Sequence, residues 1–123
     1  MTSDIPTHGW VEANGLSLHY LDWGNPTAPH VLLLHGLQDC AALWATFASK
    51  IRDRYHVVAL DHRGHGDSPR ANSYPISDYV DEVADVVRAL KLKDVTLIGH
   101  SAGSKNAWMC IAKNPHIAKK LVI

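Results

Sequence analysis

Apolar residues along the chain form short continuous runs that alternate with longer amphipathic segments. The runs lie at residues 31–34, 57–60 and 121–123, and residues 95–98 form a similar segment with Thr96 as its one polar residue. Uninterrupted runs of this length are typical of strands that are covered on both faces, as in a parallel sheet. Between them, apolar positions at helical spacing predict helices from about Ala41 to Arg52, from Ser77 or Asp78 to about Leu90, and from Ala102 to Lys113.

An N-terminal hairpin precedes this alternation. Residues 10–13 and 16–21 flank Asn14-Gly15, the dipeptide that best suits a tight type I′ turn. A hairpin followed by alternating strands and helices predicts an α/β fold, with a mostly parallel sheet and helices on both faces. Ligand chemistry in such sheets collects in the loops after the carboxyl ends of the strands, which here are residues 35–37, 61–69 and 99–103.

The segment Gly99-His100-Ser101-Ala102-Gly103 is the most specific chemical signal. It fits the pattern G-x-S-x-G directly after a predicted strand and directly before a predicted helix. Glycines are needed at both ends because the chain turns abruptly, and side chains there would collide. Ser101 is then presented at the end of the sheet, above a helix N-terminus whose partial positive charge suits an oxyanion. The pattern therefore predicts a serine nucleophile rather than a simple glycine turn.

Two further stretches, Leu34-His35-Gly36-Leu37 and the sequence DHRGHGDS at residues 61–68, accompany this turn. With them the chain resembles the alpha/beta-hydrolases of the esterase, lipase and C–C hydrolase type, from about Trp10 to Ile123. The resemblance implies the N-terminal part of a single alpha/beta-hydrolase domain over residues 1–123, truncated before the cap and the C-terminal strands.

The resemblance also implies roles for particular residues. Ser101 would be the nucleophile, and the backbone N–H groups of Leu37 and Ala102 would form the oxyanion hole. No cofactor is implied, and the partner is a small-molecule ester or related acyl substrate. Ser104 departs from the family pattern, because many relatives have a second glycine there. We expect this larger residue to affect how the following helix packs on the sheet.

The identity of residue 101 as a serine limits the classes of reaction that we expect. Similar proteins that remove halogens or open epoxides carry aspartate at this position, so Ser101 favours acyl or carbon–carbon bond hydrolysis. A small carboxylic ester is the preferred substrate. A carbon–carbon bond of a diketone-like acid, an N-terminal proline peptide and a lipid ester stay open, because the cap that shapes the acyl pocket would follow the last strand.

A base and an acid that could activate Ser101 are missing from the pattern. In this fold the chain order is Ser, then Asp or Glu, then His. The 22 residues after Ser101 contain no acid, and their one histidine, His116, precedes the last strand, whereas family histidines follow the final strand. We therefore expect an incomplete serine hydrolase that is inactive as a 123-residue chain. The alternative is a catalytically inactive, hydrolase-like binding or interaction module.

Composition excludes some classes of function. Lys plus Arg and Asp plus Glu both number 12, so the formal net charge is zero. This balance argues against a nucleic-acid partner and gives no reason for binding to an anionic membrane. No apolar run approaches the roughly 20 residues that span a bilayer, and no signal peptide is evident. We expect a cytoplasmic protein without a membrane span; its oligomeric state stays open.

Nine histidines are the one unusual count. His62 and His65 lie near Asp61 and Asp67, but no H-E-x-x-H or C-x-x-C pattern accompanies them, so we expect no metal site. The other histidines, including His8 and His19, have no supporting pattern and are interpreted as ordinary surface or partly buried residues. Phosphate-loop and dinucleotide-binding patterns fail on spacing. Cys40 and Cys110 are interpreted as small buried groups.

Overall fold

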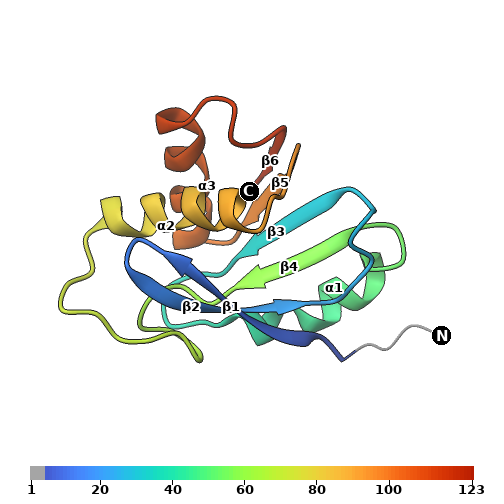
Figure 1. Ribbon diagram of the computed structural model, residues 1–123, viewed down its shortest axis with the longest axis horizontal. Helices are drawn as coiled ribbons and strands as arrows, with labels where there is room; N and C mark the ends of the chain where they lie inside the picture. The colour runs from blue at the N-terminus through green and yellow to red at the C-terminus, as the bar shows by residue number, and fades with distance from the viewer. Residues whose placement is uncertain (1–4) are drawn as a thin grey trace.

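Six strands form one sheet in the order β1-β2-β4-β3-β5-β6 (Figure 1). The computed structural model describes residues 5–123 of the chain. β1 pairs antiparallel with β2, and β2 pairs antiparallel with β4, whereas β3, β4, β5 and β6 run parallel. The prediction of a mostly parallel sheet is confirmed. The strands are β1 (Thr7–Ala13), β2 (Leu16–Asp22), β3 (His30–Leu34), β4 (His56–Leu60), β5 (Thr96–Gly99) and β6 (Lys120–Val122).

The N-terminal hairpin has the predicted turn. Asn14 and Gly15 both have positive φ, 51° and 80°. Ala13 pairs with Leu16 directly across them. A two-residue turn with both φ angles positive matches the right-handed twist of the strands that it joins. The register of the whole hairpin follows from this turn.

Helices cover both faces of the sheet (Figure 1). One face carries α1 (Ala45–Ile51), and the other carries α2 (Ile76–Ala89) and α3 (Ala102–Lys113). Side chains of β3 alternate between the two layers: Val31 and Leu33 pack with the α1 cluster, and Leu32 and Leu34 pack with the α2–α3 cluster. The apolar runs of β3 and β4 are continuous because these two central strands are buried on both sides.

Two predicted helices differ in detail from those observed. The segment predicted from Ala41 to Arg52 begins as a 3-10 helix, η1 (Ala41–Trp44), and continues as α1. The next helix begins at Ile76 and is preceded by Pro75, so the predicted cap at Ser77 or Asp78 is wrong. Proline needs no N–H partner at a helix start. The Asp78 carboxylate instead forms an ion pair with Arg63, in which Nη1 and Oδ2 are 3.1 Å apart.

β6 forms one edge of the sheet, beside β5. Its two apolar side chains, Leu121 and Val122, are exposed, and so is Ile123, which follows the strand. Among residues 5–123, no helix has the length and apolar character needed to cross a membrane.

Candidate active site

The turn between β5 and α3 holds Ser101 in an unusual backbone conformation. Its φ is 56° and its ψ is −120°, and the residue is exposed. A positive φ is uncommon for a residue with a side chain and persists only where the surroundings enforce it. Two backbone hydrogen bonds do so here. The His100 N–H donates to the Leu34 carbonyl at 3.0 Å, and the Gly103 N–H donates to the His100 carbonyl at 2.9 Å.

The glycines of the turn are required by close packing. A Cβ on Gly103 would lie 2.1 Å from the Leu34 carbonyl oxygen, and a Cβ on Gly99 would lie 2.5 Å from the Ser104 backbone nitrogen. The departure at Ser104 is accommodated, because its hydroxyl donates a 2.7 Å hydrogen bond to the Gly99 carbonyl. The first turn of α3 is therefore fastened to the end of β5 without a second glycine.

The loop after β3 lies directly against this turn. A Cβ built on Gly36 would be 3.2 Å from the Cβ of Ser101. The N–H groups of Leu37 and Ala102 donate to no protein acceptor within residues 5–123. The Ala102 amide is the first of α3, where N–H groups lack partners inside the helix. Leu37 and Ala102 also line one cavity, so the predicted oxyanion-hole residues lie in adjoining loops.

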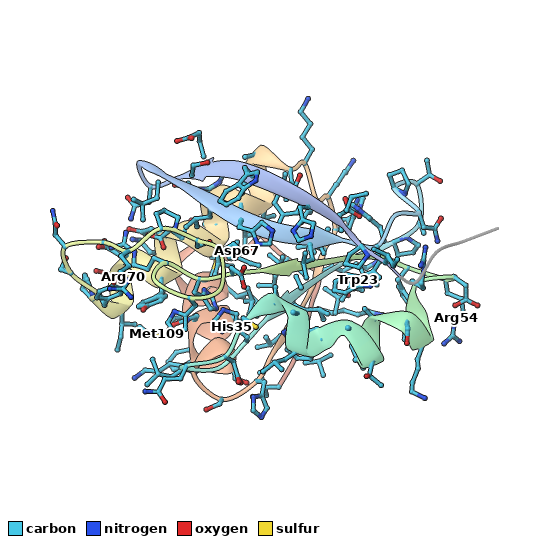
Figure 2. All side chains as sticks on the ribbon, turned by 90° about the horizontal axis from the view of Figure 1, so that it is seen from below. Trp23, His35, Arg54, Asp67, Arg70 and Met109 are labelled. Carbon is cyan, nitrogen blue, oxygen red and sulfur yellow. The ribbon has the colours of Figure 1, made fainter. Side chains whose placement is uncertain are left out.

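That cavity has a volume of about 260 Å³ and is walled mainly by apolar, aromatic and imidazole groups. Figure 2 shows the position of His35, one of the residues that line this cavity. Arg54, which follows the C-terminal end of α1, lies far from it in the same view. A larger hollow of about 540 Å³ lies at the amino ends of β3 and β5 and contains none of the predicted site residues. The smaller cavity is lined by His35, Gly36, Leu37, His62, His65, Tyr74, Ile76, Tyr79, Ala102, Lys105 and Asn106.

The histidines of this cavity are not positioned as bases for Ser101. The His35 Nδ1–H donates to the Gly36 carbonyl at 2.7 Å, and its Nε2 accepts from the His62 N–H at 3.1 Å. Burial lowers the pKa of His35 and, more strongly, that of His62. Neither ring nitrogen of His62 has a hydrogen-bond partner within the described residues 5–123. Across residues 5–123, no imidazole is hydrogen-bonded to the Ser101 hydroxyl.

A buried ion pair supports one wall of the cavity. Arg63, in the loop after β4, donates from Nε to both Glu82 oxygens, at 3.1 and 2.9 Å, and also from Nη2. Glu82 is fully buried on α2. The hydrogen bonds to Glu82 raise the pKa of Arg63, so the guanidinium stays charged. Sequence reasoning missed Glu82, although Asp78 and Glu82 at i and i+4 on one helix face signal the need for a cation.

Asp61, the first residue of the same loop, organises the polar groups around it. Its carboxylate accepts from His19 Nδ1 at 2.7 Å, from the Ala41 N–H at 2.7 Å and from the Asp67 N–H at 3.0 Å. The loop is therefore tied both to the hairpin and to η1.

Comparison with known proteins gives this geometry a context. A family model of the alpha/beta hydrolase fold matches residues 29–123. The chain belongs to this alpha/beta-hydrolase family. Its curated relatives include 2-(acetamidomethylene)succinate hydrolase of Mesorhizobium japonicum, 30% identical over 91% of this chain and 40% of that protein. They also include epoxide hydrolase 4 of Mus musculus, 32% identical over 97% of this chain and 34% of that protein.

Solved alpha/beta-hydrolase structures have the same arrangement. A membrane phospholipase A described as a bacterial virulence factor superimposes with a TM-score of 0.88, at 32% identity, over 96% of this chain and 39% of that chain. The chain thus spans well under half the length of these proteins. Both curated relatives are named as hydrolases.

Proposed function

We propose that this alpha/beta-hydrolase chain carries the nucleophile and oxyanion hole of a serine hydrolase that acts on a small carboxylic ester. Ser101 Oγ attacks the ester carbonyl, and its proton passes through a general base to the departing alcohol. Water then cleaves the acyl-serine intermediate and releases the acid. The observation that carries the proposal is the conformation of Ser101, with φ 56°, exposed between β5 and α3.

The oxyanion hole is assigned to two amides. The Leu37 and Ala102 N–H groups have no protein acceptor within residues 5–123, and both line the 260 Å³ cavity. Negative charge develops on the carbonyl oxygen as Ser101 attacks, and two preoriented donors stabilise it. Each such donor is typically worth about 3–4 kcal/mol of the barrier. The modest volume of the cavity supports a small acyl or alcohol group.

The base and its acid are proposed to come from outside these 123 residues. His35 uses both ring nitrogens in other hydrogen bonds, and His62 is buried and neutral. The chain spans 40% and 34% of the two curated relatives. Loss of triad members typically lowers turnover by about four to six orders of magnitude. The 123-residue chain alone should therefore show almost no turnover.

An ester is favoured over an epoxide by the chemistry of the nucleophile. A carboxylate that opens an epoxide forms an ester, which water can cleave in a second step. A serine would form an ether, which water does not cleave under the same conditions. Ser101 therefore supports turnover of acyl substrates only, although several of the relatives are named as epoxide hydrolases.

Labelling with a fluorophosphonate probe tests this function. We expect strong labelling when the chain is expressed with its downstream coding sequence, weak labelling of the 123-residue chain, and none in Ser101→Ala. Turnover should be measured on a short-chain p-nitrophenyl ester and on styrene oxide, with ester hydrolysis alone expected. Labelling that persists in Ser101→Ala would refute the nucleophile. An extended chain that folds but neither labels nor hydrolyses the ester would favour the inactive binding module.

A further inference from the structure

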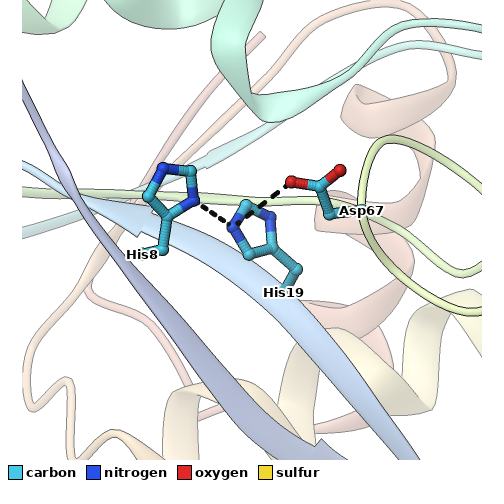
Figure 3. Close-up of side chains that lie close together, drawn as sticks. All are labelled: His8, His19 and Asp67. Atoms are coloured by element: carbon cyan, nitrogen blue, oxygen red, sulfur yellow. Dashed lines mark hydrogen bonds and ion pairs between the residues drawn. The ribbon is translucent and has the colours of Figure 1, made fainter.

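Three side chains of the types that bind metal ions come together beside the hairpin, each from a different segment of the chain (Figure 3). His8 lies on β1, His19 on β2, and Asp67 in the loop after β4. His8 Nδ1 and His19 Nε2 are 2.7 Å apart, and His19 Nε2 is 3.9 Å from Asp67 Oδ2. All three atoms lie within 4.8 Å of one another. The sequence pattern gave no reason to group these residues.

The hairpin register places the two histidines together. Trp10 pairs with His19, and His8 pairs with Leu21, so His8 and His19 are diagonal neighbours on one face of the hairpin. Diagonal neighbours on adjacent strands lie within reach of long and aromatic side chains. The opposite face of the hairpin packs against the α2–α3 cluster through residues such as Val11 and Leu18. The histidine face is therefore directed away from that core.

His19 is held in the orientation that a metal ligand requires. It is buried, and its Nδ1 lies 2.7 Å from Asp61 Oδ2. Because the Asp61 carboxylate can only accept a hydrogen bond, Nδ1 carries the hydrogen, and Nε2 presents a lone pair to His8 and Asp67. A carboxylate that binds the second ring nitrogen is the usual companion of a metal-ligating histidine, since it fixes the tautomer and raises basicity.

We propose that His8 Nδ1, His19 Nε2 and Asp67 Oδ2 bind a divalent transition-metal ion of the zinc class. Zinc–ligand bonds of about 2.0–2.1 Å in a tetrahedral site place ligand atoms about 3.3 Å apart. The observed 2.7 and 3.9 Å separations fall on either side of this value. His8 is exposed, and the Asp67 side chain is 67% exposed, so both can adjust while His19 stays fixed.

The surroundings leave room for the ion and for a further ligand. A cavity of about 140 Å³ is lined by the three side chains and by Cys40. Water would complete a tetrahedral site of three protein ligands. Two imidazoles and one carboxylate suit zinc, copper, nickel or iron(II), and they do not suit magnesium or calcium, which prefer oxygen ligands.

Binding would join the N-terminal hairpin to the loop after β4. Both contribute ligands, and that loop also carries Arg63 and the cavity residues His62 and His65. An ion that binds the folded state alone raises its stability in proportion to the logarithm of the free ion concentration. We therefore assign the ion a structural role, in which it restrains the hairpin against the loop.

The test uses the chelator-treated 123-residue chain. Titration with Zn²⁺ by calorimetry should give one site per chain, and Zn²⁺ should raise the Tm, whereas Mg²⁺ should do neither. His8→Ala and Asp67→Asn alter exposed side chains and should leave the apo fold intact, yet each should weaken Zn²⁺ binding at least tenfold. His116→Ala is the matched control, because it removes an exposed histidine elsewhere and should leave the affinity unchanged.

Co²⁺ provides a spectroscopic readout of the ligands. Visible d–d bands are expected in the unsubstituted chain and should be lost in His8→Ala. A thiolate-to-cobalt charge-transfer band that disappears in Cys40→Ser would overturn the assigned ligand set. Zn²⁺ affinity that is equal in His8→Ala, Asp67→Asn and His116→Ala would overturn the site, and so would the absence of any Zn²⁺-dependent Tm shift. The histidine pair would then be a hydrogen bond only.

Discussion

The buried ion pair between Arg63 and Glu82 should be far more sensitive to substitution than any surface pair. Replacing Glu82 by leucine leaves the Arg63 guanidinium in place with its main partner gone. Glu82 is fully buried, and the Arg63 side chain is 6% exposed, so little water can solvate the remaining charge. Removal of one partner from a buried pair typically costs about 3–5 kcal/mol.

The other contacts of Arg63 place the expected loss of unfolding free energy at the lower end of that range. Arg63 Nη1 also lies 3.1 Å from Asp78 Oδ2 and donates to the Ser73 carbonyl at 2.9 Å. Asp78 is 30% exposed and compensates part of the charge. We therefore expect Glu82→Leu to lower the free energy of unfolding by about 3 kcal/mol. At a urea m-value of about 2 kcal/mol/M, the unfolding midpoint falls by about 1.5 M.

Urea unfolding followed by tryptophan fluorescence at neutral pH measures this effect. The double variant Arg63→Met/Glu82→Leu should recover most of the loss, because it removes both charges and fills the space with apolar groups. Lys113→Met is the surface control, since the Lys113 and Asp81 side chains are 59% and 39% exposed, and it should change stability by less than about 1 kcal/mol. A Glu82→Leu effect as small as the control, or a double variant no more stable than the single one, would refute the reasoning.

Three further predictions concern packing, pH and association. Gly103→Ala places a Cβ 2.1 Å from the Leu34 carbonyl oxygen, so it should cost about 1–3 kcal/mol and disturb the Ser101 turn. Its urea midpoint should lie below that of Ser104→Ala, which loses one hydrogen bond; equal midpoints would contradict the close contact. Burial lowers the pKa of His62 well below 6.5, so the unfolded chain takes up a proton that the folded chain does not. Stability should therefore fall below about pH 6.5 by up to about 1.4 kcal/mol per pH unit from this residue, and His62→Phe should reduce that slope between pH 7 and 5. Parallel slopes in the two proteins would exclude His62 as the cause. Finally, the exposed β6 edge should make the 123-residue chain associate, and Val122→Lys should reduce the mass seen by light scattering. A native chain that is monomeric at all concentrations would show that this edge is not adhesive.

Local features of this chain could be predicted because their causes are local. Asn14-Gly15 fixes a hairpin turn through the positive φ that both residues tolerate. The apolar runs at residues 31–34 and 57–60 predicted buried parallel strands, and the structure confirms both. The run at 121–123 forms part of a parallel strand, but its residues are exposed. The Ser101 turn could also be located, since its glycines are required by contacts within a few residues or with the adjacent strand. The roles of Ser101, Leu37 and Ala102 in catalysis remain predictions.

Other features depend on which segments meet in space. Glu82 receives Arg63 because α2 packs beside the loop after β4, and the start of α2 follows Pro75 rather than a side-chain cap. His8, His19 and Asp67 converge only when the hairpin register and the loop after β4 are both set. A sequence pattern records spacing along the chain, whereas charge pairing and metal ligation depend on distances across it. The sequence therefore determined the strands and the serine turn, and the tertiary structure decided which polar groups became partners.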